Sequence, residues 1–474
     1  MKKRKIMICA AFAAAVLLSG CKPDEQPPHI EEIPQQSEPS SVQSAEELSA
    51  EEYEDILTLS AAVYPRLSVY PLEENYTDDK GYVDSDAYME AYNKYSGDLK
   101  ELRKNSDQID RISYDFYRDS MQQYLSAADG GNIAFSPVNM YMALSMLAET
   151  AGSDSRQQIL TALGEDMDTA RSNANALWRQ CYNSTPLCTQ RLANSLWLSD
   201  GMEYNSDTMK ALAENYYASV YSGEMGSEEL NAAHRKWLNE QTDGMLYEHT
   251  QDVGFTADTL MGLSSTVYYQ AQWVDEFQNI KEGVFHAPDG ELQAEFLKRT
   301  YDNKYVYCGE NYFALTEYLE GGAVMYFILP DEDISAEELA CDEEMYRMLD
   351  DPESTEKRLL EVHLSVPKFD VSAQLDLAEG MKQLGITDIF SGDTADFTPL
   401  ANIDGNIWID KAEHAVRVTM DEKGCTAAAY INIDYCGDAL PQEVEELYLT
   451  FDRPFIFVIQ QSGQPLFCGI VNRV

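Results

Sequence analysis

The chain has 474 residues, with 82 acidic against 34 basic side chains and a formal net charge of −48 at pH 7. So acidic a chain repels phosphate backbones, which argues against nucleic acid as a partner. Nine cysteines occur without a CxxC pair, and the six histidines form no HExxH or HxxxH cluster, so we expect no disulfide framework, no metal site and no cofactor.

The first twenty residues are organised like a secretion signal. A basic stretch at 2–5 precedes an apolar run over 6–18, which is too short to cross a hydrocarbon core of roughly 30 Å as a helix. The run closes on Leu-Ser-Gly-Cys, which resembles a bacterial lipobox ending at Cys21. We therefore expect residues 1–20 to be a signal peptide and the Cys21 thiol to take a lipid. The alternative is a plain secretory signal in which this cysteine is incidental.

The rest of the chain divides by composition into three parts. Residues 21–50 are rich in Pro, Glu, Gln and Ser and should form a disordered tether behind the lipid. Residues 51–106 are rich in Tyr, Asp and Glu and are interpreted as an N-terminal extension packed on the main domain, with helical patterning over 87–102. The main domain is expected at 107–474. We expect an exported protein, anchored on the outer face of a bacterial cell membrane only through its lipid or released to the extracellular space.

Within the main domain, Ser136 followed by Pro137 is a helix-start signature, because Ser caps a helix and Pro suits its first position. Strands are predicted at 195–198, 264–269, 323–329, 360–366, 407–409, 447–451 and 455–460. Helices are predicted at 208–217, 230–240 and 375–384. Many strands of mixed spacing, with helices in blocks between them, favour an α+β fold.

Several short motifs in this domain, taken in order, resemble the serpin family. They are Asn132 with Ser136-Pro137, Ala193-Asn194-Ser195-Leu196-Trp197, Trp237-Leu238-Asn239 with Thr242 and Gly244, Trp273 with Phe277, Val366-Pro367-Lys368-Phe369, Leu384-Gly385-Ile386 with Asp388 and Phe390, Arg453-Pro454-Phe455, and Leu466-Phe467-Cys468-Gly469. Each motif is weak alone, but their shared order is specific. The resemblance implies a large mixed β-sheet, smaller sheets, about eight or nine helices and an exposed reactive loop.

The segment 422–429 resembles the hinge of that reactive loop. Its residues are Glu422, Lys423, Gly424, Cys425, Thr426, Ala427, Ala428 and Ala429. In the family, a protease attacks the exposed loop and becomes acylated, and the loop then inserts as a new strand in the large sheet. At Cys425 the family usually has Thr or Ser, which is a mild departure because Cys has a similar volume and buries well.

The residues that follow the hinge alternate as a buried strand would. One set comprises Cys425, Ala427, Ala429, Ile431, Ile433 and Tyr435. The other comprises Thr426, Ala428, Tyr430, Asn432, Asp434 and Cys436. The first set has no charge, whereas the second holds every charged or amide side chain, which favours burial of the first set against a core. No Pro interrupts 422–440, and Gly424 gives backbone freedom at the bend. An ordinary edge strand would explain the alternation but not the alanine run.

The resemblance places the reactive bond at Asp438-Ala439, within a window that extends to residue 444 because the following stretch varies in length. Asp438 before the bond suits a protease that accepts acidic residues, and cutting after Ala439 suits an elastase-like enzyme. Cutting after Leu440 is disfavoured by Pro441. The expected partner is an endopeptidase of the serine class, with the cysteine class as the alternative, and the chain is expected to act as a monomer.

The resemblance also assigns four supporting residues. Ser136 and His414 match positions that hydrogen-bond beneath the opening sheet, and Ser265 stands where the family often has Asn. Trp273 matches the residue under the point where the loop first enters the sheet. His414 and Trp273 can equally be read as buried core residues.

A disulfide between Cys425 and Cys436 would prevent insertion. Eleven residues of strand would separate the two cysteines by roughly 36 Å, at about 3.3 Å per residue, whereas a disulfide needs Cα atoms roughly 4.4–6.8 Å apart. The alternative is two free thiols.

Taken together, the sequence predicts a suicide inhibitor of proteases and not an enzyme. The alternative function is that of a non-inhibitory serpin, which would use the same fold to bind a partner. A hydrolase is not expected, because the chain has no GxSxG elbow.

Overall fold

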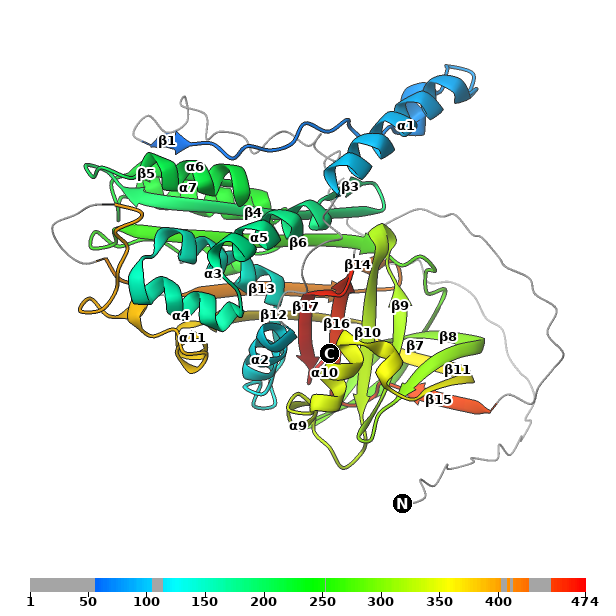
Figure 1. Cartoon of the computed structure of the whole chain (residues 1–474). Coiled ribbons are helices and arrows are strands. Elements are labelled where there is room, and N and C mark those ends of the chain that lie inside the picture. Colours follow the sequence, from blue (N-terminus) through cyan, green and yellow to red (C-terminus); the bar gives the residue numbers. More distant parts are fainter. Residues whose placement is uncertain (1–55, 105–113, 252, 402–406, 410–411, 426–444) are drawn as a thin grey trace, which may run out of the picture. The chain divides into compact units, whose positions relative to one another are not determined.

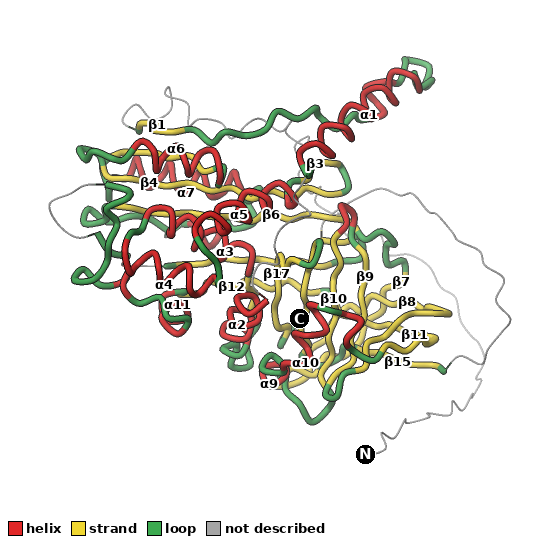
Figure 2. The backbone as a smooth tube through the Cα atoms, in the orientation of Figure 1, coloured by secondary structure: helices red, strands yellow, loops and turns green. Residues whose placement is uncertain are grey.

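The computed structural model describes residues 56–104, 114–251, 253–401, 407–409, 412–425 and 445–474. Within these residues it contains seventeen strands and eleven α-helices, two of which, α8 (Tyr247–Thr250) and α9 (Ala336–Leu339), are only four residues long. Figure 1 shows the elements in sequence colours, and Figure 2 shows helices, strands and loops in the same orientation. No helix in the described part is long and apolar enough to cross a membrane.

The larger sheet has nine strands, and many of their side chains belong to the apolar core. Its order is β15-β11-β8-β9-β10-β16-β17-β2, with β7 paired to β8. The strands are β2 (Ile133–Phe135), β7 (Asn279–Ala287), β8 (Gly290–Cys308), β9 (Tyr312–Tyr318), β10 (Ala323–Pro330), β11 (Lys357–Pro367), β15 (Glu446–Thr450), β16 (Phe455–Gln461) and β17 (Gln464–Val471). The last two are buried along nearly their whole length, which explains their almost unbroken apolar sequences.

The remaining strands form two separate sheets. One has the order β1-β5-β4-β6-β14, with β3 paired to β4, and the other is the antiparallel pair β12-β13. We refer to the two together as the second, or divided, sheet, because their strands β6 and β13 line one cavity. The strands are β1 (Leu57–Ser60), β3 (Asn183–Thr185), β4 (Cys188–Ser199), β5 (Ala218–Gly223), β6 (Met261–Gln272), β12 (Phe369–Asp376), β13 (Glu413–Met420) and β14 (Gly424–Cys425). On the edge away from β4, the strand β6 pairs with β14 only at Ala271 and Gln272. Among the described strands, the rest of that edge has no partner, and β13 pairs with β12 alone.

Helices pack against the strands of both large sheets. They are α2 (Tyr114–Leu125), α3 (Pro137–Thr150), α4 (Ser153–Leu163), α5 (Met167–Cys181), α6 (Ser206–Asn215), α7 (Glu228–Gln241), α10 (Glu343–Asp350) and α11 (Ala378–Gln383). Of these, α3, α5, α6 and α7 contact β4, β5 or β6, whereas α2 contacts β2 and β17, and α10 bonds with β9 and β16. Short 3-10 turns occur at η3 (Glu320–Gly322), η4 (Pro352–Ser354) and η5 (Asp388–Phe390). The predicted start of α3 is confirmed, because Ser136 is the N-cap and its Oγ accepts a hydrogen bond of 3.2 Å from the backbone N–H of Asn139.

The helices α3 and α7 lie on opposite faces of β6. Successive side chains of a strand point to opposite faces. The Ser265 hydroxyl donates to the Asn139 side-chain oxygen on α3, whereas the hydroxyl of its neighbour Ser264 lies 2.7 Å from His234 Nε2 on α7. The α3 side is the core side, because α3 also contacts β17 and is almost wholly buried.

The N-terminal extension is built from β1, the turn η1 (Glu73–Tyr76) and α1 (Ser85–Leu102). The strand β1 adds to the outer edge of β5, and the Val63 N–H donates to the Ala213 carbonyl at 3.0 Å. The Tyr64 ring stacks on Tyr217, with ring centroids 6.1 Å apart. The extension therefore makes hydrogen bonds and ring contacts with β5, α6 and the residues between them.

Two predicted elements differ from the structure. Residues 407–409 are not a strand; the Ile409 N–H donates instead to the Ile389 carbonyl of a neighbouring turn. The predicted helix over 375–384 starts too early, because Leu375 still belongs to β12 and pairs with His414, and α11 begins at Ala378. In both places a short apolar run was compatible with strand and helix, and tertiary contacts decided between them.

Candidate functional site

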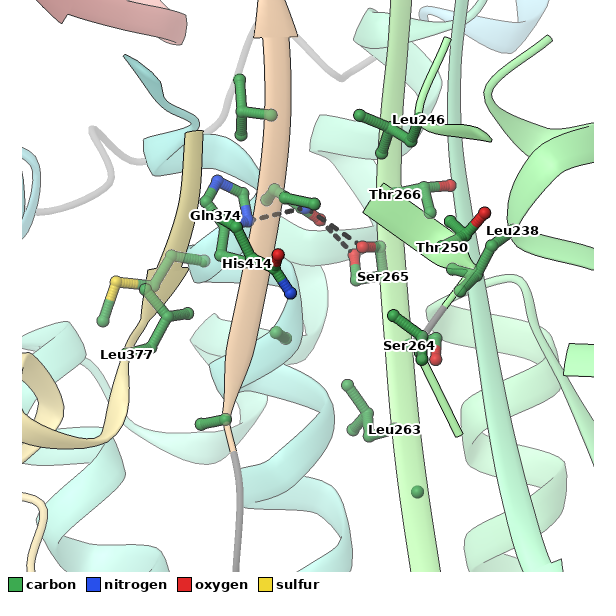
Figure 3. A pocket seen from close by; sticks show the side chains of 18 of the residues that line it. Leu238, Leu246, Thr250, Leu263, Ser264, Ser265, Thr266, Gln374, Leu377 and His414 are labelled. Carbon is green, nitrogen blue, oxygen red and sulfur yellow. Dashed lines mark hydrogen bonds between the residues drawn. The ribbon is translucent and has the colours of Figure 1, made fainter. Parts of the chain in front are cut away.

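A cavity of about 630 Å³ occupies the division in the second sheet. Its walls come from β6 on one side and β13 on the other, with α3 and α7 contributing side chains on the two faces. Figure 3 shows Ser265 and His414 on these two strands, with Leu263 and Ser264 further along β6. Because both strands present an edge to the cavity, they have backbone groups there that a further strand could pair.

A polar bridge spans this cavity on the core side. The Asn139 amide nitrogen donates to the Ser265 carbonyl oxygen at 3.1 Å, and the Ser265 hydroxyl donates to the Asn139 side-chain oxygen. The same amide nitrogen lies 3.4 Å from Nδ1 of His414, and the ring Nε2 accepts from the Ser136 N–H at 3.1 Å. One side chain of α3 thus satisfies a strand-edge carbonyl that has no strand partner among the described residues.

The structure therefore brings three predicted residues, Ser136, Ser265 and His414, into one network. The residue that joins them, Asn139, was missed. Its signal was present in the sequence, since it is a polar residue three positions after the N-cap in a helix that is otherwise strongly apolar.

Burial keeps the histidine of the bridge neutral. His414 is 5% exposed, and loss of solvation lowers its pKa from 6.5 to about 4. A neutral ring can accept the Ser136 N–H at Nε2, whereas a protonated ring would place two donors against each other there.

A second buried histidine lies on the α7 side. His234 Nε2 is 2.7 Å from the Ser264 hydroxyl, so it links α7 to the same strand. Burial lowers its pKa to about 3. Its Nδ1 is buried and has no hydrogen-bond partner in the described part of the chain.

Trp273 follows the last residue of β6. It lies beside the turn that follows β13. Its indole Nε1 donates to the Asp421 carbonyl at 2.9 Å, and its backbone N–H donates to the Lys423 carbonyl at 3.0 Å. The Phe277 N–H donates to the Glu422 carbonyl at 2.9 Å. The carbonyls of Asp421 and of the first two hinge residues are therefore fixed, so Trp273 contacts the hinge and is not part of the polar bridge.

Glycine is required at position 424. Its φ of 143° is a conformation that other residues rarely adopt, and a Cβ there would clash with the Ala271 carbonyl oxygen. The close approach allows Gly424 and Cys425 to pair with the last residues of β6.

An ion pair fixes the acidic side chain of the same turn. Lys368 Nζ lies 2.7 Å from Glu422 Oε2 and 3.0 Å from Glu295 Oε2. The hydrogen bond from Lys368 lowers the pKa of Glu422 below its usual range. The turn is therefore held by both its backbone and one side chain.

The remaining predicted site residues lie outside the described residues. They are Cys21, Thr426, Ala427, Ala428, Ala429, Cys436, Asp438 and Ala439. Five of the described cysteines are free thiols, namely Cys181, Cys188, Cys308, Cys341 and Cys468. Within the described part, no group of three His, Cys, Asp or Glu side chains is arranged to hold a metal ion.

The resemblance implied a large sheet that the reactive loop enters, and the structure has a cavity between β6 and β13, with Gly424 and Cys425 paired to one end of β6. The chain belongs to the serpin family, because the model of that family, described as "Serpin (serine protease inhibitor)", matches residues 109–474. The predicted α+β serpin fold is confirmed.

Curated relatives agree with this assignment. The chain is 27% identical over 396 residues to alpha-1-antiproteinase S of Cavia porcellus, covering 79% of this chain and 92% of the relative. It is 25% identical over 374 residues to the plasma serine protease inhibitor of Mus musculus, covering 76% of this chain and 89% of the relative.

Two solved structures share the fold. The native state of the thermophilic serpin tengpin superimposes with a TM-score of 0.67 at 23% identity, covering 77% of this chain and 93% of tengpin. Human thyroxine-binding globulin, in complex with thyroxine, gives a TM-score of 0.66 at 21% identity, covering 78% and 99%. At these identities the likeness concerns the fold alone.

Proposed function

We propose that this chain is a protease inhibitor that acts as a suicide substrate. A serine or cysteine endopeptidase attacks the carbonyl of the reactive bond, its nucleophile forms an acyl bond with the inhibitor, and the new amine leaves with a proton. The loop then enters the divided sheet before water can hydrolyse the acyl bond. The observation that carries this proposal is the pairing of the hinge with the free edge of β6.

The register of that pairing sets the length of strand that fits. Gly424 lies opposite Gln272 and Cys425 opposite Ala271, with the two chains antiparallel. Continued without a bulge, the same register puts Ile431 opposite Ser265 and Tyr435 opposite Met261. Residues 424–435 therefore match β6 from end to end, and the predicted bond at Asp438-Ala439 follows three residues later.

The same register also assigns faces. Residues directly opposite each other in an antiparallel pair point to the same side of the sheet. Ala427 would share a side with Tyr269, whose ring contacts Phe467 in the core, and Ile431 would share it with Ser265 on the α3 side. The uncharged set found from sequence alternation is thus the set that would face the core, whereas Asn432 and Asp434 would face the α7 side.

The test mixes the full-length chain with elastase, a glutamyl endopeptidase and a cysteine endopeptidase. We expect at least one of them to form a covalent complex that survives SDS, and mass spectrometry of the released peptide to locate the bond. The Ala427→Arg variant should be cleaved without forming the complex, because it puts a charge on the core-facing row. The neighbouring Ala428→Arg variant, on the opposite row, is the matched control and should still trap the enzyme.

One outcome would reject inhibition: cleavage of the loop by these enzymes with neither a complex nor a rise in thermal stability, which would favour the non-inhibitory binding function. Equal trapping by the two arginine variants would leave inhibition standing and would reject the stated register, because that register places only Ala427 on the core-facing row.

The proposal also covers the division of the chain into segments and its attachment to the membrane. We take residues 1–20 as a signal peptide, 21–50 as a lipidated tether starting at Cys21, 51–106 as the extension and 107–474 as the inhibitory domain. The protein then acts as a monomer on the outer face of a bacterial membrane, against elastase-like or acidic-residue-preferring enzymes. Loss of membrane fractionation and of palmitate labelling in Cys21→Ser tests the anchor independently of inhibition.

A further inference from the structure

We propose that the outward face of β8, β11 and β15 is a docking surface for the endopeptidase that engages the loop. We call it the tyrosine face and define it by Tyr305, Leu359, His363 and Tyr448. The inference rests on the proposed function and deepens it, because it names a surface of this chain that would select the target enzyme before the bond is cut.

The alternation along β11 defines the face. Its side chains Leu360, Val362 and Leu364 are buried, whereas Leu359 and His363 point to the other side. The outer face of this part of the nine-stranded sheet is therefore open over all three strands.

The exposed side chains lie opposite one another across the strands. Leu359 pairs with Tyr305, and His363 pairs with Tyr448 on its other side. The His363 and Tyr448 rings are stacked, with centroids 4.4 Å apart and an interplanar angle of 16°. Tyr448 is 70% exposed, Tyr305 57% and Leu359 47%. The face thus carries two cross-strand pairs of large side chains, with Glu361 between them on β11 and its carboxylate 3.5 Å from the His363 ring.

The chemistry of the face suits a protein partner. Tyrosine is enriched in protein interfaces because it contributes a large, rigid contact area with little side-chain entropy to lose. Here the stack with His363, and the Lys357 ammonium 5.6 Å from the Tyr305 ring, orient the rings before any partner arrives. A preordered aromatic surface of this kind loses less entropy on binding.

The position of the face along the chain identifies the partner. The strand β15 begins at Glu446, and the preceding Glu445 is fixed by its carbonyl, which accepts the Glu361 N–H at 3.0 Å, and by an ion pair with Arg358. Six residues separate Glu445 from Ala439, so the predicted bond lies within about 22 Å of this point even if the chain is fully extended. A bond nearer to residue 444 would be closer still.

An enzyme bound at that bond is large enough to reach the tyrosine face. A protease domain of about 230 residues has a radius of gyration of about 17 Å, so its body reaches beyond the 22 Å span in most directions. The outward side of β15 is the side it can contact, because Leu449 on the inner side is buried. The enzyme is therefore the one partner whose presence beside this face follows from the chain's own geometry.

The test measures association rates of the full-length chain with each enzyme that the wild type traps, from a panel of elastase, glutamyl endopeptidase and subtilisin. With at least one enzyme we expect Tyr448→Ser and Tyr305→Ser each to slow complex formation by about tenfold, as loss of an interface aromatic typically does. The stoichiometry of inhibition and the thermal midpoint should not change. Tyr448→Phe should keep the rate, because it keeps the ring.

The matched control is Tyr82→Ser, since Tyr82 is 73% exposed but belongs to the N-terminal extension. Rates within twofold of wild type for both serine variants, with every enzyme that is trapped, would overturn the docking surface and leave the inhibitory function standing. A fall in thermal midpoint that parallels the fall in rate would also overturn it, because the tyrosines would then be structural. If the wild type traps no enzyme, the proposed function fails and the docking surface fails with it.

Discussion

The two large sheets of this chain differ in how completely their strands are paired. In the nine-stranded sheet, β10, β16 and β17 have partners on both edges and are packed in apolar side chains throughout. In the second sheet, most of one edge of β6 and one edge of β13 face a cavity and have no strand partner among the described residues. One sheet is therefore complete, whereas the other has room for a further strand.

The unpaired strand edges of the second sheet mean that insertion of a further strand would lower the free energy of the chain. A net contribution of about 1 kcal/mol per hydrogen bond, over about ten ladder bonds to two neighbouring strands, gives on the order of 10 kcal/mol for filling the gap. Until then a few side chains, Asn139 foremost, substitute for the absent pairing. We therefore expect substitutions in the complete sheet to cost stability, and substitutions at the gap to change mainly local opening.

The largest expected effect is a core truncation in the complete sheet. Phe457→Ala removes a fully buried ring that stacks on Phe369 with centroids 5.0 Å apart, so we expect a loss of about 4 kcal/mol in the free energy of unfolding. Leu263→Ala removes a partly buried side chain that already faces the cavity and should cost less than half as much. Urea unfolding of both variants measures this, and equal losses would remove the proposed contrast between the sheets.

Acid should weaken the gap through its buried histidines. The pKa of His414 is about 4 in the folded chain and near 6.5 when unfolded, so the unfolded chain binds more protons between these values. Stability is therefore fully present above about pH 6.5 and is lost as pH falls towards 4, by about 3 kcal/mol for this residue. His234 adds a loss of the same sign, which extends to lower pH.

The measurement compares the pH dependence of unfolding in wild type and His414→Gln. The glutamine oxygen can still accept the Ser136 N–H but does not titrate in this window. We expect the variant to lose less stability than wild type between pH 7 and pH 4. Parallel curves would mean that folding does not shift the pKa of His414.

The polar bridge itself should have an intermediate effect. Asn139→Ala leaves the Ser265 carbonyl without its donor and the Ser265 hydroxyl without its acceptor, which we expect to cost about 1–3 kcal/mol. Because the two side chains share hydrogen bonds, the double variant with Ser265→Ala should cost less than the sum of the single variants.

Hydrogen exchange can show where the loss occurs. In Asn139→Ala, the amides of β6 should exchange faster, whereas those of β16 should not. The matched control is Asn194→Ala, whose amide donates to the Tyr216 carbonyl at 2.7 Å on the fully paired strand β4. If both variants accelerate the same amides, the bridge has no special relation to the gap.

The sequence predicted the parts of this site that depend on local patterns. Ser136-Pro137 starts α3 as expected, and the predicted strand over 264–269 lies inside β6. Alternation after Cys425 separated a charged from an uncharged set before any register was known. These signals are readable because capping and strand period are properties of neighbouring residues.

The parts that it did not predict depend on residues distant in the chain. Asn139 joins Ser265 across 126 positions, and no local pattern indicates that pairing. The same holds for residues 407–409, where an apolar run that favours a strand is instead held by the Ile389 carbonyl. The two-residue pairing of β14 with β6, on which the register depends, likewise follows only from the folded chain.

The smallest expected effect concerns the ion pair at the hinge. Lys368→Ala removes contacts to Glu422 and Glu295, but these side chains remain partly exposed, so we expect a cost of about 1 kcal/mol or less, and less still at high salt. The turn should persist, because Trp273 and Phe277 still bind its carbonyls.

The effect of Lys368→Ala on the hinge should nevertheless exceed its effect on stability. Without the lysine, the pKa of Glu422 should rise towards its usual value, and the amides of Gly424 and Cys425 should exchange faster. The matched control is Arg417→Ala, which breaks a paired surface contact with Asp370 on the β12-β13 side. Faster exchange at the hinge in Lys368→Ala but not in Arg417→Ala would show that the ion pair restrains the turn from which the loop must enter. Equal exchange in the two variants would leave Trp273 as the main restraint on that turn.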